Sequence, residues 1–399
     1  MFNLLFSESR SIEDPNTPLN LSDESNWSIS GESVNEQSAM KLAAVYACIG
    51  VLGRSLGQLP LHVMRRTKGK VERATDHPLY DILHTEPNKW QTSYDWRETS
   101  MCHVSGWGDA YNYINRNNKG EVVSLDIVRP WECNLIETSN KRYVYSVSNS
   151  DLDIHSVQLE DMIHIKAIGS CGKTGTSPIR QCSESFALGM ASQKYGNKFF
   201  GGGGRPTAIV GPKGALNKES WGWLQTAWKA ATTKLRNEDN STLLLPADMD
   251  YKQLTIAPED AQFLETRKFS RSEVAGIYNV PAHMINDLEK ATFSNISEQA
   301  IQFVRHTMMP WIVKYEQELN RKLFTKIERK AGYYVKFNLN GLLRGTAKDR
   351  AEFYTKAIRD GWMSRAEVRE FEEMNPADGL EKFIISADLQ LKVTPNEKA

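Results

Sequence analysis

Residues 257–295 read APEDAQFLETRKFSRSEVAGIYNVPAHMINDLEKATFSN, and their order of helix and loop signals decides the fold. The Pro-Glu-Asp at 258–260 opens a helix, because proline suits the first turn and the macrodipole favours acidic side chains there. The helix is expected to reach about Tyr278 and to stop before the proline that follows. Residues 281–296 then predict a short loop, and in its polar stretch from Leu288 onward Lys290 is the only basic residue.

A second helix after the loop carries the strongest helical pattern in the chain. Its apolar residues recur at three- and four-residue steps and form one stripe. The members of the stripe are Ile296, Ala300, Phe303, Val304, Met308, Trp311, Ile312, Tyr315, Leu319, Leu323 and Ile327. Pro310 is expected to kink this helix, because it lacks an N–H and its ring collides with the preceding turn. The pattern therefore predicts two long helices interrupted by a polar loop.

Another helix and a small insert precede this pair. Ser177 and Pro178 are typical of an N-cap and a first helical position, so a helix is expected from there to about Phe200. The four glycines at 201–204 indicate a stop and a joint, and a ligand cradle is the less favoured alternative. Residues 205–257 predict a strand (TAIV), a helix and a second strand (TLLLP).

The predicted helix of the insert is rich in tryptophan. It carries Trp221, Trp223 and Trp228, and the first and third of these share a face with Leu224. One interpretation is that the three rings form the core of a small subdomain. The other is a protein-docking surface, since tryptophan is enriched at interfaces and a unit of this size has little interior.

The first half of the chain predicts a mixture of helices and strands. Residues 1–35 are polar and predict a flexible arm, and residues 36–59 predict a helix that ends at a proline. A capping box at Thr92–Asp95 starts a second helix. The alternating runs AYNYINR and EVVSLDIVRP, separated by NNKG, predict a hairpin, and MIHIKAI predicts a strand with His164 on its exposed face.

The C-terminal part predicts one strand and two helices. YYVKFNLNGLL is typical of a strand. Capping boxes that begin at Thr346 and Ser364 start the two helices, and Gly361 lies between them.

Composition excludes some function classes. Lys+Arg and Asp+Glu both number 49, so the formal net charge is zero, whereas a protein that grips nucleic acid through many phosphates usually has a basic excess. Any DNA contact is therefore expected to be local or weak. The five cysteines are scattered, which disfavours a disulfide framework or a zinc site. A membrane pore is the second alternative function, but no apolar run reaches the roughly 18–20 residues of a membrane span.

An enzyme is the first alternative function, because AIGSCGKTG (167–175) resembles a phosphate-binding loop. That motif needs GxxxxGK[ST] running into a helix, but its first glycine position is Ala167 and the helix starts several residues late. A surface loop is the favoured interpretation. No HExxH and no helical histidine pair occurs, so we expect no catalytic residue, metal or cofactor.

Four blocks of the sequence together resemble the portal proteins of tailed, double-stranded DNA bacteriophages. The blocks are AVYACIGVLGRSLGQLPLHVMRR, HPLYDILHTEPNKWQTSYDWRETSMCHVSGWGDAYNYINR, TSPIRQCSESFALGMASQKYGNKFFGGGGRPTAIV and APEDAQFLETRKFSRSEVAGIYNVPAHMINDLEKATFSN. They run in order from about residue 36 to 345, and the last is the most specific.

The resemblance implies an α+β portal-type fold with named parts. It implies a mixed α/β wing, a two-helix stem, a small α/β clip, a tunnel loop and a short helical crown. The expected bounds are 1–35 for the N-terminal arm, 36–176 for the first part of the wing, 177–204 and 258–280 for the stem helices, 205–257 for the clip, 281–296 for the tunnel loop, 297–345 for the wing return with its kinked helix, and 346–399 for the crown and tail.

The resemblance also implies a non-enzymatic function. Portal proteins form a ring, usually dodecameric, at one vertex of the capsid, and double-stranded DNA passes through it non-specifically during packaging and ejection. The implied partners are other copies of the chain, the terminase, a head–tail adaptor, and the major capsid and scaffold proteins, with no membrane. The implied location is the virion, after assembly in the cytoplasm of the host bacterium. Trp221, Trp223 and Trp228 of the clip are the implied docking residues.

A tunnel loop must approach a moving duplex without holding it. Each lysine–phosphate contact deepens binding, so several lysines repeated around a ring would clamp the DNA. Lys290 beside Glu289 gives a nearly balanced ring, and Thr292, Ser294 and Asn295 offer neutral hydrogen bonds. Phe293 is expected to pack between neighbouring loops. The alternative is that Lys290 is an ordinary solvated residue.

Overall fold

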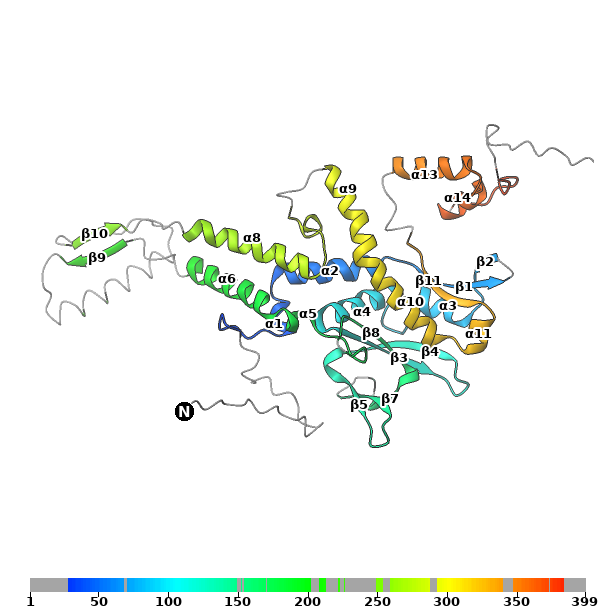
Figure 1. Cartoon of the computed structure of the whole chain (residues 1–399), viewed down its shortest axis with the longest axis horizontal. Helices are drawn as coiled ribbons and strands as arrows, with labels where there is room; N and C mark the ends of the chain where they lie inside the picture. Colours follow the sequence, from blue (N-terminus) through cyan, green and yellow to red (C-terminus); the bar gives the residue numbers. More distant parts are fainter. Residues whose placement is uncertain are drawn as a thin grey trace, which may run out of the picture.

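The computed structural model has the α+β architecture that the sequence predicts. It describes residues 28–67, 70–148, 152, 154–169, 171–201, 208–212, 222, 226, 249–253, 259–287, 293–339, 347–372 and 374–383. Figure 1 shows a body of helices and small sheets from which two long helices, α6 and α8, extend side by side toward a two-stranded sheet. The C-terminal helices lie apart from the body, at the upper right of this view (Figure 1).

The helices follow the predicted order with several breaks. Their bounds are α1 Glu36–Ala39, α2 Ala43–Gly57, α3 Pro78–His84, α4 Ser93–Trp107, α5 Pro178–Gln181, α6 Ser183–Gly201, α8 Glu259–Ile277, α9 Phe293–Gln302, α10 Met309–Leu323, α11 Lys326–Lys330, α13 Ala347–Arg359 and α14 Arg365–Phe371. Short 3₁₀ turns occupy Pro130–Glu132 (η2), Leu159–Asp161 (η3) and Ala282–Ile285 (η4).

The strands form small antiparallel sheets. Their bounds are β1 Leu61–Thr67, β2 Lys70–Arg73, β3 Asp109–Arg116, β4 Val122–Val128, β5 Cys133–Glu137, β6 Tyr143–Val147, β7 Ser156–Gln158, β8 Met162–Lys166, β9 Ala208–Pro212, β10 Met249–Gln253 and β11 Tyr333–Phe337. The strand orders are β11-β1-β2, β4-β3-β8, β5-β6-β7 and β10-β9. The predicted hairpin is β3–β4, and β1 pairs with β11 from the distant C-terminal part.

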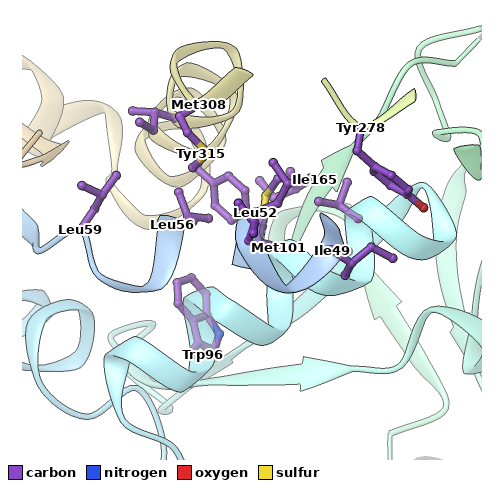
Figure 2. Packing of buried hydrophobic residues seen from close by; sticks show 14 of the residues in the cluster. Ile49, Leu52, Leu56, Leu59, Trp96, Met101, Ile165, Tyr278, Met308 and Tyr315 are labelled. Atoms are coloured by element: carbon purple, nitrogen blue, oxygen red, sulfur yellow. The ribbon is translucent and has the colours of Figure 1, made fainter. Parts of the chain in front are cut away.

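The main core lies where α2, α4 and α10 meet. Leu52 and Leu56 of α2 lie beside Met101 of α4 and Tyr315 of α10, and Ile49 of α2 belongs to the same core (Figure 2). The Tyr315 side chain is fully buried, and its hydroxyl lies 2.9 Å from that of Ser100, which satisfies both polar groups. Burial of side chains of this size stabilises each by roughly 1.5–3 kcal/mol, so this contact sets the position of α10.

The predicted helix over 36–59 is broken in two. Asn35 caps α1 through a capping box, α1 ends at Ala39, and Leu42 is extended and begins α2. Residues 28–35, which composition assigned to the arm, pack on the body. Val34 is buried in the main core, and Glu32 pairs with Lys194 of α6 at 2.7 Å. One core residue and one ion pair therefore fix the end of this segment.

The kink predicted at Pro310 is a π-helical segment, Phe303–Met308 (η5), between α9 and α10. Proline donates no backbone hydrogen bond, and its ring collides with the preceding turn of an α-helix. A π turn, with its wider i→i+5 hydrogen bonds, leaves room for the proline ring. Phe303, Val304, Thr307 and Met308 of this segment are buried. From Phe303 to Leu323 the stripe thus stays on the core side although the helix changes its period. Ile327, the last predicted member, lies in α11 after the chain breaks at Phe324 and is 80% exposed, so its place in the stripe was wrong.

His164 is buried, and its prediction as an exposed strand residue was wrong. Its Nε2 lies 2.8 Å from Asp109 Oδ1 and its Nδ1 lies 3.1 Å from the Tyr145 hydroxyl. The β5-β6-β7 sheet contributes Tyr145 to a second small core against β3, so both faces of β8 are covered. Burial lowers the pKa of His164, and Asp109 opposes that shift. Alternation alone could not reveal the covering sheet.

The predicted helix over 177–200 is also interrupted. Ser177 is its N-cap and accepts a hydrogen bond from the Arg180 N–H, as expected. The chain then turns at Cys182, and α6 starts at Ser183 and ends at Gly201, the first of the four glycines. The strand TAIV is confirmed by β9, which pairs with β10 at Met249–Gln253, whereas TLLLP lies outside the described residues.

Candidate functional site

The predicted polar loop begins at a tightly fixed base. α8 ends at Ile277, and the Val280 N–H then donates to the Ala275 carbonyl at 2.9 Å, a bond that closes the helix end. Asn279 has a positive φ of 51°, which asparagine tolerates better than most residues. Val280 and Ile285 are buried in the main core on either side of Pro281. The start of the loop is therefore part of the packed body.

Asn279 ties this base to the π-helical segment. Its side-chain amide donates to the Thr307 hydroxyl at 2.9 Å, and that hydroxyl donates to the Asn279 carbonyl at 2.7 Å. Thr307 is only 5% exposed, so both bonds are shielded from water. Burial raises the pKa of the adjacent Tyr278. The end of α8 and the middle of the kinked helix are thus held as one unit.

Further bonds fix the rest of the approach to the loop. His283 Nδ1 lies 2.9 Å from Gln299 Oε1 of α9, and Arg271 of α8 donates to the Ile285 carbonyl. Asn286 is left-handed, with φ 59°, and the Asp287 N–H donates to the Ala282 carbonyl at 3.0 Å. These contacts fix the direction in which the chain leaves residue 287.

The predicted loop residues fall into two groups. Glu289, Lys290 and Thr292 lie outside the described residues. Phe293, Ser294 and Asn295 form the first turn of α9, so the loop ends earlier than residue 296. The sequence holds the reason, since Phe293 extends the three- and four-residue spacing of the stripe. Serine and asparagine destabilise the first turn of a helix little, because their side chains can bond to the N–H groups that have no helical partner there.

The predicted docking residues of the insert, Trp221, Trp223 and Trp228, also lie outside the described residues. Nearby, Gly222 and Thr226 are helical, and the Thr226 hydroxyl donates to the Gly222 carbonyl at 2.9 Å. This bond agrees with the helix predicted there. The choice between core and docking surface stays a prediction.

The loop that resembles a phosphate-binding motif has its polar groups engaged by protein. The Lys173 ammonium donates to the Tyr143 hydroxyl at 2.6 Å and lies 4.3 Å from that ring. The Gly175 N–H donates to Asp109 Oδ1 at 2.6 Å. A carboxylate therefore holds the backbone donor that a phosphate would need, and the lysine is turned to a tyrosine.

The described residues contain no cluster of three or more His, Cys, Asp or Glu placed to hold a metal ion. Within the same ranges, the helices are all too short or too polar to cross a membrane.

Sequence reasoning missed the contacts that position the loop. The Asn279-Val-Pro sequence after a helix was the available signal, because asparagine often takes the left-handed position that ends a helix. The Asn279–Thr307 and His283–Gln299 pairs join residues 28 and 16 positions apart. No local pattern encodes such pairs.

Comparison with known proteins places this geometry in a family. The family described as phage portal protein matches residues 43–373. The probable portal protein of Streptomyces phage phiC31 is 31% identical over 373 residues, covering 90% of this chain and 81% of the relative. The portal protein of Enterobacteria phage HK97 is 26% identical over 364 residues, covering 87% and 82%.

Solved structures have the same fold. A chain in the virion of a native gene transfer agent particle has a TM-score of 0.60 at 20% identity, covering 86% of this chain and 94% of that chain. The HK97-family phage portal protein from Corynebacterium diphtheriae has a TM-score of 0.56 at 14% identity, covering 78% and 96%. With a family match over most of its length and a relative above 30% identity, this chain belongs to the phage portal protein family.

Proposed function

We propose that this protein is the subunit of a closed ring and that residues 281–292 line its channel. Portal proteins occupy a capsid vertex and provide the channel through which DNA is packaged, and this chain shares that general function. The observation that supports the loop assignment is the fixed base, from which residues 288–292 leave between the anchored Asp287 and the start of α9. A loop on a rigid base keeps a constant distance to a passing duplex.

The composition of the loop suits a sliding contact. Lys290 lies next to Glu289 and near Asp287, so the loop has no basic excess and carries a net charge of −1 per subunit. Phosphate contacts release counterions and bind DNA strongly, whereas a ring without excess positive charge guides the duplex without clamping it. Thr292 supplies a neutral hydrogen-bonding group.

The named parts of a portal subunit follow from this assignment. The body with its β sheets corresponds to the wing, α6 and α8 to the stem, the insert around β9 and β10 to the clip, and α13 with α14 to a short crown. The stem helices extend from the body toward β9 and β10 (Figure 1), as a stem that carries a clip would.

Ring closure requires one surface of each subunit to fit a different surface of the next, because a heterologous contact closes only at the correct rotation. A dodecamer is our proposal. Neck structures of gene transfer agent particles computed with C12 and C6 symmetry contain chains of this fold, with TM-scores of 0.58 and 0.59.

The partners and location are proposed on the same basis. The clip, with Trp221, Trp223 and Trp228, would dock the terminase during packaging and the head–tail adaptor afterwards. The wing would face the major capsid and scaffold proteins. The ring would assemble in the host cytoplasm, remain in the virion and conduct DNA again at ejection.

The ring is tested by native mass spectrometry and negative-stain microscopy of the purified full chain, alone and after co-expression with its capsid protein. We expect closed rings with a central hole. A monomer under both conditions, together with its absence from the vertex of purified virions, would refute the proposal.

The portal family is structural and non-enzymatic in general, and we propose that this chain has no catalytic activity of its own. The alternative, a phosphate-binding loop, is tested by titrating ATP into the wild type and Lys173→Ala. We expect no binding to either protein. Tight binding that disappears in Lys173→Ala would support the alternative instead.

A further inference from the structure

Two segments that are far apart in the sequence form one strongly basic end of the molecule. β1 pairs with β11 on one side and with β2 on the other, and α11 leads directly into β11. We define the basic tip as six exposed residues of this unit: Arg66, Lys70 and Arg73 from the sheet, and Lys326, Arg329 and Lys330 from α11. A chain with no net charge thus concentrates positive charge in one place.

The cations of the basic tip have no acidic partner among the described residues. Within the described ranges none of the six lies in an ion pair, whereas Lys336 on the same sheet is neutralised by Glu316 at 3.0 Å. Arg66 is held with its guanidinium 5.7 Å from the centre of the Tyr334 ring, which fixes its direction without neutralising it. The six charges therefore remain available to an external anion.

The nearby acidic groups do not cancel this charge. Glu328 of α11 is turned back to cap its own helix at Thr325, and it lies 3.4 Å from His77 Nε2. Glu72 lies opposite Arg65 in the β1–β2 register, and Asp76 is exposed in the turn after β2. Three carboxylates thus stand beside six free cations, so the tip keeps a positive potential.

The position of the tip limits what it can meet. β2 and α11 lie at the opposite end of the molecule from β9 and β10 (Figure 1). If β9 and β10 belong to the clip that faces outward to packaging and tail proteins, the basic tip faces the interior of the shell. This step rests on the proposed function. The macromolecule that fills that interior is the packaged DNA.

We propose that the basic tip binds the phosphate backbone of double-stranded DNA inside the shell, as a second contact surface separate from the channel loop. The contacts are sequence-independent, because lysine and arginine on an exposed surface read phosphates and not base edges. Weak, repeated contacts around a ring would hold the nearest turns of the genome without obstructing the channel.

The shape of the tip favours DNA over an acidic protein segment. Protein anchors usually fill pockets. Two hollows of the described chain, one between residues 32–42 and α6 and one of about 350 Å³ between β8 and α10, contain no residue of the basic tip. Cross-strand register places Arg66 and Arg73 on one face of the sheet and Lys70 on the other. A sheet edge with positive charge on both faces suits a long polyanion.

The test uses the full chain and a fluorescein-labelled 30-base-pair duplex, with affinity measured by anisotropy over a range of salt concentrations. The variant is Lys326→Gln/Arg329→Gln/Lys330→Gln, which leaves the Glu328 cap intact. The matched control is Lys119→Gln/Lys141→Gln/Arg142→Gln, which removes the same charge from exposed turns elsewhere. We expect the slope of log K against log salt to fall by about 2.7 in the variant, roughly 0.9 for each lost phosphate contact, and to stay unchanged in the control.

Equal slopes for the two variants would overturn the proposal. So would tip-dependent binding of labelled poly-glutamate at salt concentrations where the duplex does not bind, which would indicate an acidic protein partner. Ring formation is measured on the same samples. A wild type that forms no rings alone or with its capsid protein, and that is absent from the virion vertex, would refute the proposed function, whereas normal rings with no tip-dependent DNA binding would refute this inference alone.

Discussion

Thr307→Val is expected to loosen the base of the channel loop. Valine has nearly the same shape as threonine, so packing at this buried position is kept while the hydroxyl is lost. That hydroxyl donates to the Asn279 carbonyl at 2.7 Å and accepts from the Asn279 amide at 2.9 Å. The substitution therefore removes two bonds between the end of α8 and the π-helical segment.

The magnitude follows from these two bonds. Each intramolecular hydrogen bond contributes a net of about 1 kcal/mol, and buried groups left without partners cost more. The free energy needed to open this unit locally therefore falls by about 2 kcal/mol. Since 1.4 kcal/mol is a factor of ten, amides that exchange through local opening lose protection by about 30-fold.

Hydrogen exchange followed by mass spectrometry measures this directly, in peptides covering 270–287 and 303–315. Thr355→Val is the matched control, because the Thr355 hydroxyl donates to the Ala351 carbonyl on an exposed helix face, away from the loop base. It should leave exchange in these peptides unchanged. If Thr307→Val changes protection by less than about threefold, or no more than the control does, the Asn279–Thr307 pair does not hold the loop base.

Three further outcomes are expected. Gly53→Ala places a Cβ 2.6 Å from Cys102 Sγ and should destabilise by about 1–3 kcal/mol in thermal unfolding, whereas Gly276→Ala meets open space and should be neutral or stabilising. Burial, aided by neighbouring positive charges, lowers the pKa of His62 from 6.5 to about 4. The neutral ring therefore contributes its full share to the stability of the fold above pH 6.5, and this share is lost as the pH falls toward 4. His62→Gln should make the decline of Tm over that pH range less steep. Lys290→Glu should leave folding intact but change packaging yield or DNA retention in complemented phage, and an unaltered yield would remove the channel role of Lys290.

Local signals in the sequence located most helix starts correctly. The capping boxes at Thr92–Asp95 and Ser364–Glu367 have both reciprocal bonds, and Ser177 caps α5 as predicted. These predictions are correct because a helix cap depends only on residues within one turn of each other. Pro310 likewise marked the change of helical period before α10, because the missing N–H acts on its own turn.

Features that depend on tertiary contacts were not predictable in the same way. The alternation of the strand predicts that His164 is exposed, but in the fold the β5-β6-β7 sheet covers it. Val34 belongs to a polar segment but is buried in the main core. For the candidate site, the sequence located the loop and the helices on both sides. It did not reveal the Asn279–Thr307 link, because that bond exists only once the two helices pack.

The net charge of zero shows how an average can hide a site. Residues 61–73 and 326–337 contain nine Lys and Arg against two Glu, so the rest of the chain carries a net charge of −7. Composition led to the expectation that any DNA contact is local, and the antiparallel pairing of β1 with β11 provides such a locality. Neither segment alone is long enough to suggest a binding surface. A balanced total is what a conduit needs, because a duplex must pass the loop freely, and it remains compatible with a fixed basic surface away from the path of the duplex.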